Sequence, residues 1–465
     1  YDPQDGSFYT VLGLFDDDVA IRQGWKASAE YEGQVNDIRL AYSWSSDMKD
    51  VFSGYNTYGQ VYEKILGCNA VLDYVDDVQG SEDEKNNVKA QALALRGYYY
   101  WFLVNLYGQP YSYNKDALGV PLQLTSELDE SGKPRNTVGE VYDQILKDLQ
   151  EAERLFASLP ESMQVLRNNR VNLPFTQLML SRVCLYMENW EQALAYANLV
   201  IDNNNFGILD LNSLPLPDMY GNPAYMDYYT YDNPEVIFLF GNWYDVLSLT
   251  MMSYVNYGEE TPGGMINWTK YNLPVVSESL INAYGTDGTD LRRRHYLIPD
   301  EYNATPYYQP CSKFRVDNGF RLQPSTTSGN WGVAFKVTEA YLNGAEAAAM
   351  LFKNGAGANY QTEAQALLDD LRVNRVVNGS FENVSIVDPD ELVAFVRDER
   401  RRELCFENHR WFDLRRYGME PLTHIWYDES NNASEFVLEK NAPGFTLQIP
   451  NEAFEHNSAM VQNEI

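Results

Sequence analysis

The sequence predicts a mainly α fold: a tetratricopeptide-like helical repeat scaffold, an α/α superhelix, overlaid by an irregular layer of loops rich in aromatic residues. Two observations lead to this prediction. Paired helical patterns fill residues 57–204 and 336–418, and such units stack because a single helical repeat cannot bury its own apolar face. Residues 205–335 hold many Pro, Gly, Tyr and Trp residues and little helical periodicity. We expect residues 1–465 to form one domain.

Composition and charge exclude several classes of protein. The chain has 465 residues, with 35 Lys and Arg against 66 Asp and Glu, and a formal net charge of −31. So acidic a chain repels phosphate backbones and shows no basic stripe, which argues against nucleic-acid binding. Hydrophobic residues make up 45% of the chain, enough for a core. Clean apolar runs such as residues 236–240 are far short of the ~18 residues that suggest a membrane-spanning helix.

The first scaffold segment starts with a helical pattern over residues 57–78. Ser81 and Glu84 then form a capping box, in which each side chain accepts a backbone N–H of the other residue. The long helix behind this box is expected to end at Gly108 in a left-handed conformation. A second capping box at residues 137–140 opens the next helix.

Two predicted helix pairs resemble tetratricopeptide units. Residues 174–201 form two helices with a break near residues 188–189, and a pair of this kind spans ~34 residues. Residues 336–352 and 362–376 form the second pair, in which alanines allow the helices to approach closely. We expect these pairs to stack against the first helices of the scaffold.

The last strong helix begins at Asp388, which is followed by a proline at the first helical position. It is expected to continue to residues 417–418. On that helix Glu399, Glu403 and Glu407 would lie one turn apart, and neighbouring arginines could interleave with them. The cluster could be an active site, but a helix-locking ion-pair network is favoured, because arginine–carboxylate pairs are a common structural device.

The layer at residues 205–335 is expected to carry short strands such as residues 236–240 and a helical stretch at residues 275–284. The chain has 35 Tyr, 9 Trp and 20 Phe, and many of the tyrosines fall in Gly-, Pro- and Asn-rich segments. Such rings offer an apolar face and a polar group, which suits stacking on flat ligands such as sugar rings. An ordinary amphipathic surface is the alternative.

No catalytic or metal-binding motif stands out. The four histidines form no H-E-x-x-H spacing, and no nucleophile elbow, P-loop or dinucleotide fingerprint occurs. Residues 287–290 could hold calcium, but they lack the twelve-residue loop pattern, so we expect a capped turn and no cofactor. Cys68, Cys184 and Cys405 lie in helix-like stretches and should be free and buried. Any pair among the acids could serve a glycosidase, and their separation decides that.

The sequence closely resembles the SusD/RagB family. The strongest likeness is Glu-Arg-Arg-Arg-Glu-Leu at 399–404, then Phe-Glu at 406–407 and His-Arg-Trp-Phe-Asp-Leu-Arg-Arg at 409–416. Further likenesses occur in the family's order, at residues 69–72, 90–101, 106–108, 119–122, 135–145, 339–347 and 448–452. Together these segments span nearly the whole chain.

This resemblance implies a non-catalytic lipoprotein on the outer surface of a Gram-negative outer membrane. Such proteins bind a nutrient, usually an oligosaccharide, and deliver it to a SusC-like TonB-dependent barrel. The chain starts at Tyr1 with neither Met nor an apolar leader. We therefore expect that a signal peptide has been removed and that the lipid-bearing cysteine lies upstream of Tyr1.

The resemblance also implies that loop aromatics, flanked by amides and acids, hold the ligand. Sugar C–H faces stack on rings, and hydroxyl groups need planar donors and acceptors. The aromatic candidates are Tyr55, Tyr58, Tyr111, Tyr113, Trp243, Tyr244, Trp268, Tyr271 and Trp331. Their expected polar partners are Asp47, Asn242 and Asn267.

Other functions remain open at this point. The same scaffold could bind a peptide or another non-sugar nutrient. A glycoside hydrolase would be revealed by cleavage of the bound glycan. A helical scaffold for protein partners should show a continuous concave face, and residues 205–335 instead interrupt the repeats.

Overall fold

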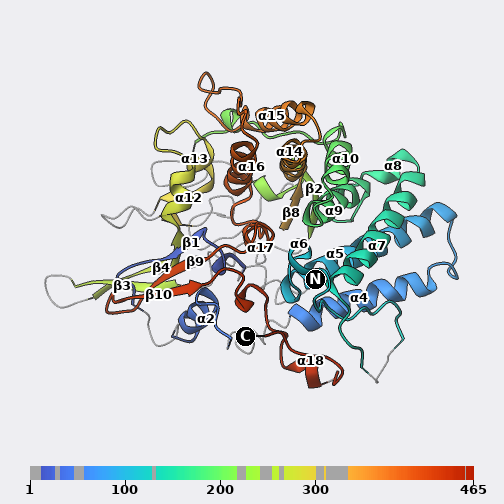
Figure 1. The fold of residues 1–465 in the computed structure, drawn as a ribbon, viewed down its shortest axis with the longest axis horizontal. Helices are drawn as coiled ribbons and strands as arrows, with labels where there is room; N and C mark the ends of the chain where they lie inside the picture. The colour runs from blue at the N-terminus through green and yellow to red at the C-terminus, as the bar shows by residue number, and fades with distance from the viewer. Residues whose placement is uncertain are drawn as a thin grey trace.

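The computed structural model describes residues 12–26, 32–46, 57–127, 132–216, 227–240, 254–260, 266–299, 308–309, 333–455 and 457–464. The fold is mainly α, as predicted (Figure 1). The helices are α2 (Glu32–Tyr42), α4 (Thr57–Tyr74), α5 (Glu82–Tyr107), α6 (Tyr111–Asn114), α7 (Val138–Ser158), α8 (Glu161–Gln164), α9 (Leu173–Tyr186), α10 (Trp190–Ile201), α12 (Glu278–Ala283), α13 (Arg292–Tyr296), α14 (Val337–Lys353), α15 (Ala358–Arg372), α16 (Pro389–Leu404), α17 (Arg410–Arg416) and α18 (Glu452–Glu455).

Stacked helices form the scaffold. Helix α5 packs between α4 and α7, α7 packs on α9, and α9 pairs with α10. Helix α14 then packs on α10 and is flanked by α15 and α16. The result is a continuous stack that runs from α4 to α15 and α16, seen across the right and upper parts of Figure 1. The predicted helix pairs therefore exist and stack on one another.

Local capping explains where several of these helices begin. Ser81 and Glu84 form the predicted capping box, and Thr137 and Glu140 form the second one. At the start of α16, the Asp388 carboxylate accepts hydrogen bonds from the backbone N–H groups of Asp390 and Glu391, at 2.9 Å each. Each cap satisfies N–H groups that a helix leaves without an intrahelical partner.

The predicted left-handed end of α5 is wrong. Gly108 has φ −115° and ψ 161°, which is extended backbone. A glycine is still required there, because a Cβ would lie 2.8 Å from the carbonyl oxygen of Val104. The close approach comes from the chain turning sharply out of the helix rather than from a positive φ.

Small antiparallel sheets lie between and after the helices. The strands are β1 (Val19–Ile21), β2 (Val236–Phe240), β3 (Tyr254–Glu260), β4 (Ile266–Asn272), β5 (Pro274–Val276), β6 (Ile298–Pro299), β7 (Tyr308–Gln309), β8 (Val333–Lys336), β9 (Leu422–Tyr427) and β10 (Ala433–Leu438). They pair as β1 with β5, β2 with β8, β3 with β4, β6 with β7, and β9 with β10. The predicted strand at 236–240 is β2, and its partner β8 leads directly into α14.

The predicted helix at residues 275–284 is only partly right. Residues 274–276 form β5, which pairs with β1 from near the start of the chain. Ser277 then caps α12, and its hydroxyl accepts the N–H of Leu280. Strand pairing with a distant segment overrides the local helical pattern at these first residues.

The C-terminal helix is also interrupted, which corrects the prediction of one helix from residue 388 to 418. Helix α16 ends at Leu404 and α17 starts at Arg410. Between them Phe406 and Asn408 adopt φ of 61° and 62°. Glu407 lies in this turn, so it does not follow Glu403 by one helical turn, and its carboxylate instead accepts a hydrogen bond from Lys336 Nζ at 2.8 Å.

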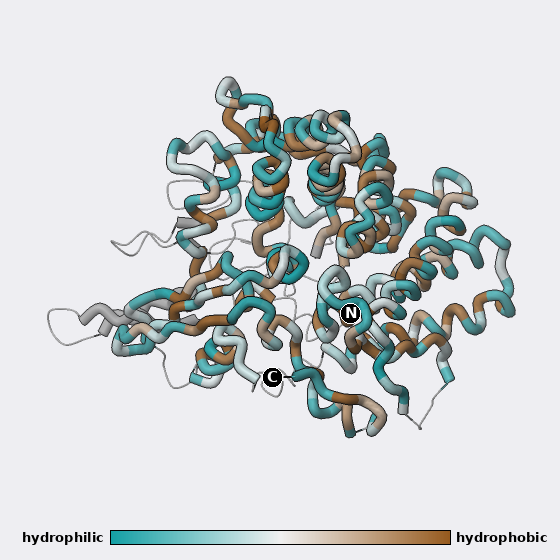
Figure 2. The backbone as a smooth tube through the Cα atoms, in the orientation of Figure 1, coloured by the Kyte–Doolittle hydropathy of each residue, from teal (hydrophilic) through white to brown (hydrophobic). Residues whose placement is uncertain are grey.

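A large hydrophobic core joins elements from η2 (Leu12–Leu14) through the helical stack to Met460. Figure 2 shows hydrophobic and hydrophilic residues interleaved along the helices, as expected for helices that each bury part of their surface in this core. None of the helices in the described part of the chain is long and apolar enough to cross a membrane. The assignment of residues 1–465 to one domain, divided into scaffold and layer, stays a prediction.

Candidate functional site

A pocket of about 550 Å³ opens where the start of α4, the loop before α7 and the segment around α18 meet. We call it the Tyr58–Met460 pocket. Its lining consists of Tyr58, Gly59, Tyr62, Pro121, Gln123, Gly132, Lys133, Glu452, Ala453, Glu455, Asn457 and Met460. Its volume lies within the range of about 300–1,000 Å³ typical of small-molecule sites.

The aromatic wall comes from one helix face. Tyr58 and Tyr62 are one turn apart on α4, and their ring centroids lie 5.0 Å apart. The Tyr62 hydroxyl donates to the carbonyl oxygen of Pro121 at 2.7 Å, and that of Tyr58 to the sulfur of Met460 at 3.4 Å. Burial raises the pKa of Tyr58 to about 12 and that of Tyr62 well above its usual value, so both phenols are neutral.

A chain of polar contacts through the helical stack positions the loop that carries Gln123. Asp148 on α7 accepts two hydrogen bonds at 2.7 Å from Arg96 on α5. Arg96 donates in turn to the side-chain oxygen of Asn69 on α4 at 2.8 Å. The amide of Asn69 then donates to the carbonyl oxygens of Gln123 and Thr125 at 2.9 and 3.1 Å. The loop is thereby fixed to three helices.

Arg135 joins the same loop to the C-terminal segment. Its guanidinium donates to the carbonyl oxygens of Gly119, Tyr107 and Leu118 at 2.6–2.9 Å, and to that of Val461 at 3.0 Å. The amide of Asn457 adds a hydrogen bond of 2.7 Å to the carbonyl oxygen of Lys133. Residues separated by more than three hundred positions are therefore held together at the pocket, and burial lowers the pKa of Arg135.

The described lining of the pocket offers rings and polar groups to a ligand, and both of its carboxylates belong to one short helix. Aromatic rings, amides and carbonyl groups line its inner part, whereas Lys133, Glu452 and Glu455 supply charge. Both carboxylates come from the short helix α18, so they approach a ligand from one wall. Glycoside hydrolysis ordinarily needs two carboxyl groups that flank the scissile bond.

The structure places the sequence-predicted site residues in different parts of the fold. Tyr58 lines the pocket, but it lies on α4 rather than in a loop. Tyr111 and Tyr113 lie on the short helix α6, where Tyr111 is half-buried with its ring 4.9 Å from that of Tyr142, and Tyr113 is 52% exposed. Neither of them lines this pocket.

The prediction of loop positions for Trp268, Tyr271 and Asn267 is wrong. These residues lie on β4, opposite Gly258, Val255 and Glu259 of β3. The two strands form a hairpin, which the irregular mixture of polar and aromatic residues did not reveal. The remaining candidates lie outside the described residues: Asp47, Tyr55, Asn242, Trp243, Tyr244 and Trp331.

The sequence prediction missed Tyr62, Gln123, Lys133 and Asn457. Tyr62 could have been found, because it follows Tyr58 by four residues on a predicted helix. The other three meet α4 only through tertiary packing, and nothing local in the sequence marks them.

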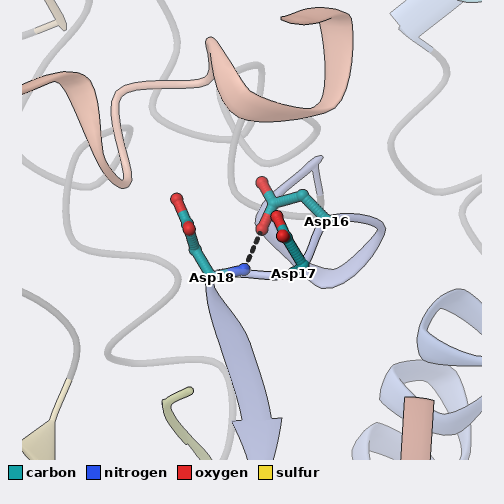
Figure 3. Close-up of side chains that lie close together, drawn as sticks. All are labelled: Asp16, Asp17 and Asp18. Carbon is teal, nitrogen blue, oxygen red and sulfur yellow. Dashed lines mark hydrogen bonds between the residues drawn. The ribbon is translucent and has the colours of Figure 1, made fainter. Parts of the chain in front are cut away.

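In the described part of the chain, the carboxylates of Asp16, Asp17 and Asp18 lie close enough together to be considered as ligands of a metal ion (Figure 3). Arginines already neutralise two of these carboxylates: Arg410 donates twice to Asp17 at 2.7 and 2.9 Å, and Arg401 donates to Asp18 at 2.7 Å. Burial and the charge of Asp18 raise the pKa of Asp16 well above its usual value. The triplet therefore anchors the early segment on α16 and α17, and it carries no case for a cation.

The other calcium candidate is a capped turn, as expected. Asp287 accepts hydrogen bonds from the backbone and hydroxyl of Thr289 at 3.1 and 3.0 Å, and Asp290 pairs with Arg292 at 2.7 Å. Cys68, Cys184 and Cys405 are free and buried, as predicted. The absence of a cofactor stays a prediction.

The predicted ion-pair network exists, but neighbouring arginines alone do not make it: Arg402 pairs from the same helix, whereas Arg292 and Arg375 come from other segments of the chain. Glu403 accepts from Arg375 at 2.8 Å and from Arg292 at 3.2 Å, and Glu399 pairs with Arg292 and Arg402 at 2.7 and 2.6 Å. Both glutamates are fully buried. Because each charge is paired inside the core, this cluster locks helices together and is not open to a substrate.

Comparison with known proteins identifies relatives along most of the chain. A family model described as "Starch-binding associating with outer membrane" matches residues 15–183, and a model described as "SusD family" matches residues 242–465. SusD-like protein P38 of Formosa agariphila is 25% identical over 403 residues, covering 77% of this chain and 71% of the relative. SusD-like protein P25 of the same organism is 22% identical, covering 96% and 87%.

Solved structures share the fold. A SusD-like carbohydrate binding protein from Bacteroides vulgatus has a TM-score of 0.69 at 22% identity, covering 98% of this chain and 91% of that one. A laminarin binding SusD-like protein has a TM-score of 0.64 at 21% identity, covering 99% and 95%. The helical stack with its inserted strands therefore also occurs in these solved structures.

Proposed function

Because this chain belongs to the SusD/RagB family, we propose that it binds an oligosaccharide without cleaving it. The observation that carries this proposal is the pair of family matches, one of them described as starch-binding, across both halves of the chain. A laminarin binding protein of the same fold supports it. Starch and laminarin are both glucans, so sugar binding is the property that these relatives have in common.

We place sugar binding at the Tyr58–Met460 pocket. Its two tyrosine rings offer apolar surface to sugar C–H groups, and its amide and charged side chains offer partners to hydroxyl groups. A site of this kind, with few hydrogen bonds, gives dissociation constants of about 10 μM to 1 mM. The aromatic residues Trp268 and Tyr271 on β4 remain candidates for a further part of the binding surface.

The family description also supports a place at the outer membrane. We propose that the protein sits on the outer surface of that membrane through an N-terminal lipid anchor. There it would deliver the bound glycan to a TonB-dependent transporter. A weak site suits this role, because a glycan that is held too tightly would not be released to the barrel.

The test is isothermal titration calorimetry against laminarin, maltodextrin, xylan and mannan oligosaccharides. We expect one glycan class to bind and no cleavage products to appear. Tyr62→Ala should abolish that binding, whereas Tyr74→Ala, on the same helix and 62% exposed outside the pocket, should leave it unchanged. Circular dichroism of both variants checks that the helices persist.

Each other result has a distinct meaning. Cleaved products would overturn the non-catalytic assignment. Binding that survives Tyr62→Ala would remove the pocket from the proposal and move attention to Trp268. If no glycan binds, the proposal of sugar binding is overturned, and a peptide or another nutrient is favoured as the ligand.

A further inference from the structure

Several positive charges of this protein pair with carboxylates in its interior. In the described residues, Arg96, Arg182, Arg292, Arg375, Arg400 and Arg416 are buried, and each pairs with a carboxylate at 2.5–2.8 Å. Their partners satisfy them, and burial keeps them away from any ligand. The excess of acidic side chains, which gives a formal charge of −31, therefore dominates the field that a ligand meets.

The charged part of the Tyr58–Met460 pocket repeats this imbalance. Among the lining residues that the structure describes, the charged groups are the ammonium group of the half-buried Lys133 and the exposed carboxylates of Glu452 and Glu455. An anionic group that enters would face more negative than positive charge. Exposed charges of this kind act over about a Debye length, ~10 Å at 0.1 M salt, which covers a pocket of this size.

The guanidinium group behind the tyrosines cannot compensate. Arg135 is 7% exposed and donates to four carbonyl oxygens, those of Tyr107, Leu118, Gly119 and Val461. An arginine has five N–H groups, so most of its donor capacity is already used. Recruiting it for a sulfate or carboxylate would break contacts that hold the pocket together.

From these observations we propose that the pocket selects uncharged glycans and rejects sulfated and uronate-bearing ones. This inference rests on the proposed sugar-binding function and adds the chemical class of the sugar. Hydroxyl groups of a neutral chain can bond to carboxylates, amides and Lys133 alike, because a hydroxyl both donates and accepts. A sulfate or carboxylate group only accepts, so Glu452 and Glu455 repel it.

The test compares matched pairs of probes in calorimetric titrations. The pairs are laminarin oligosaccharides with and without chemical sulfation, and xylo-oligosaccharides with and without methylglucuronic acid. The neutral member should bind at least about tenfold more tightly at low salt. The difference should shrink when sodium chloride rises from about 50 mM to about 500 mM, since salt screens repulsion.

Charge variants locate the effect. The double variant Glu452→Gln/Glu455→Gln should narrow the affinity ratio between the neutral and the anionic member several-fold, because the glutamine amides still bond to hydroxyl groups but no longer repel an anion. The matched control is Glu161→Gln/Glu191→Gln, which removes the same charge from exposed helix starts outside the pocket. That control should leave both affinities unchanged.

The outcomes separate the two proposals. Equal or tighter binding of the anionic member, lost in Lys133→Met, overturns charge selection while sugar binding stands. The same gain in the control as in the pocket variant overturns the local origin of the effect. Failure of every neutral and anionic glycan to bind overturns sugar binding, and charge selection with it.

Discussion

Arg182 on α9 and Glu339 on α14 form a buried ion pair with two parallel hydrogen bonds of 2.6 and 2.5 Å. The guanidinium carbon also lies 5.0 Å from the ring centroids of Trp101 and of Phe335. The pair therefore joins two helices of the stack that are 157 positions apart in sequence. Two parallel N–H···O bonds fix the geometry as well as the charge.

Removing one partner of this pair should be costly. Arg182→Met leaves the Glu339 carboxylate buried without its counter-charge, and we expect the free energy of unfolding to fall by about 3–5 kcal/mol. The double variant Arg182→Met/Glu339→Met should recover much of that loss, because both charges are then absent. Urea denaturation of the three proteins measures this. Equal stability of the single and double variants would contradict it.

Helix spacing at Gly97 gives a second prediction. A Cβ at Gly97 on α5 would lie 2.9 Å from Cγ of the buried Leu149 on α7. Gly97→Ala should therefore push the two helices apart and cost about 1–3 kcal/mol. Gly67 on α4 has no atom within 4 Å of its Cβ position, so Gly67→Ala should instead stabilise the helix by up to about 1 kcal/mol. Thermal unfolding of both variants should show shifts of opposite sign.

Acid should weaken the core network. Burial alone would raise the pKa of Glu399, but Arg292 and Arg402 lower it to about 2, and Arg416 does the same for Glu346. Both pKa values lie below the usual value of 4.5. Between about pH 2 and pH 4.5 the unfolded chain therefore binds more protons than the folded protein. Stability from these pairs is complete above pH 4.5 and is lost as the pH falls toward about 2.

Burial of His295 extends this effect to milder acid. Burial and the charge of Arg375 lower its pKa to about 4 from 6.5, so the folded state resists the proton that the unfolded chain accepts. We expect the melting temperature to decline gradually below about pH 6.5 and steeply below about pH 4.5. His295→Phe should reduce the first decline, to which the lowered pKa values of buried His409 and His424 also contribute, and leave the second. A melting temperature that is flat from pH 7 to pH 3 would contradict both assignments.

Arg135 is expected to act as a positioning residue for the pocket. Arg135→Met leaves four carbonyl oxygens, including that of Val461, without their donor. Amide hydrogen exchange should then rise in residues 132–137 and 457–464, and glycan affinity should fall. Arg154→Met is the matched control, because Arg154 is exposed and pairs within α7 with Glu151. Unchanged exchange in Arg135→Met would remove this role.

Local signals allowed much of the scaffold to be predicted. The capping boxes at Ser81 and Thr137 and the cap at Asp388 lie where the sequence placed them. Each depends on residues within one helical turn, so the sequence contains the whole interaction. The same holds for the paired helices α9 and α10, whose apolar faces recur at helical spacing.

Features that depend on distant segments could not be predicted in this way. Strand β5 exists because β1 pairs with it, although its residues continue a helical pattern. The break between α16 and α17 comes from positive φ at Phe406, a residue type with no turn signal. At the pocket, Tyr58 was a candidate on its own merits, whereas Asn457 becomes a neighbour only in the folded chain.

The two sides of the Tyr58–Met460 pocket are some four hundred positions apart in sequence. During synthesis, α4 and α5 can pair early, because their contacts are local. The pocket cannot form until α18 and the residues after it have been made and have docked on Arg135. Until then Tyr58 and Tyr62 stay exposed as apolar surface to which chaperones can bind. If the proposed sugar site is this pocket, it forms only after residues 452–461 have docked, and proteolytic removal of these residues should abolish binding while the helical stack persists.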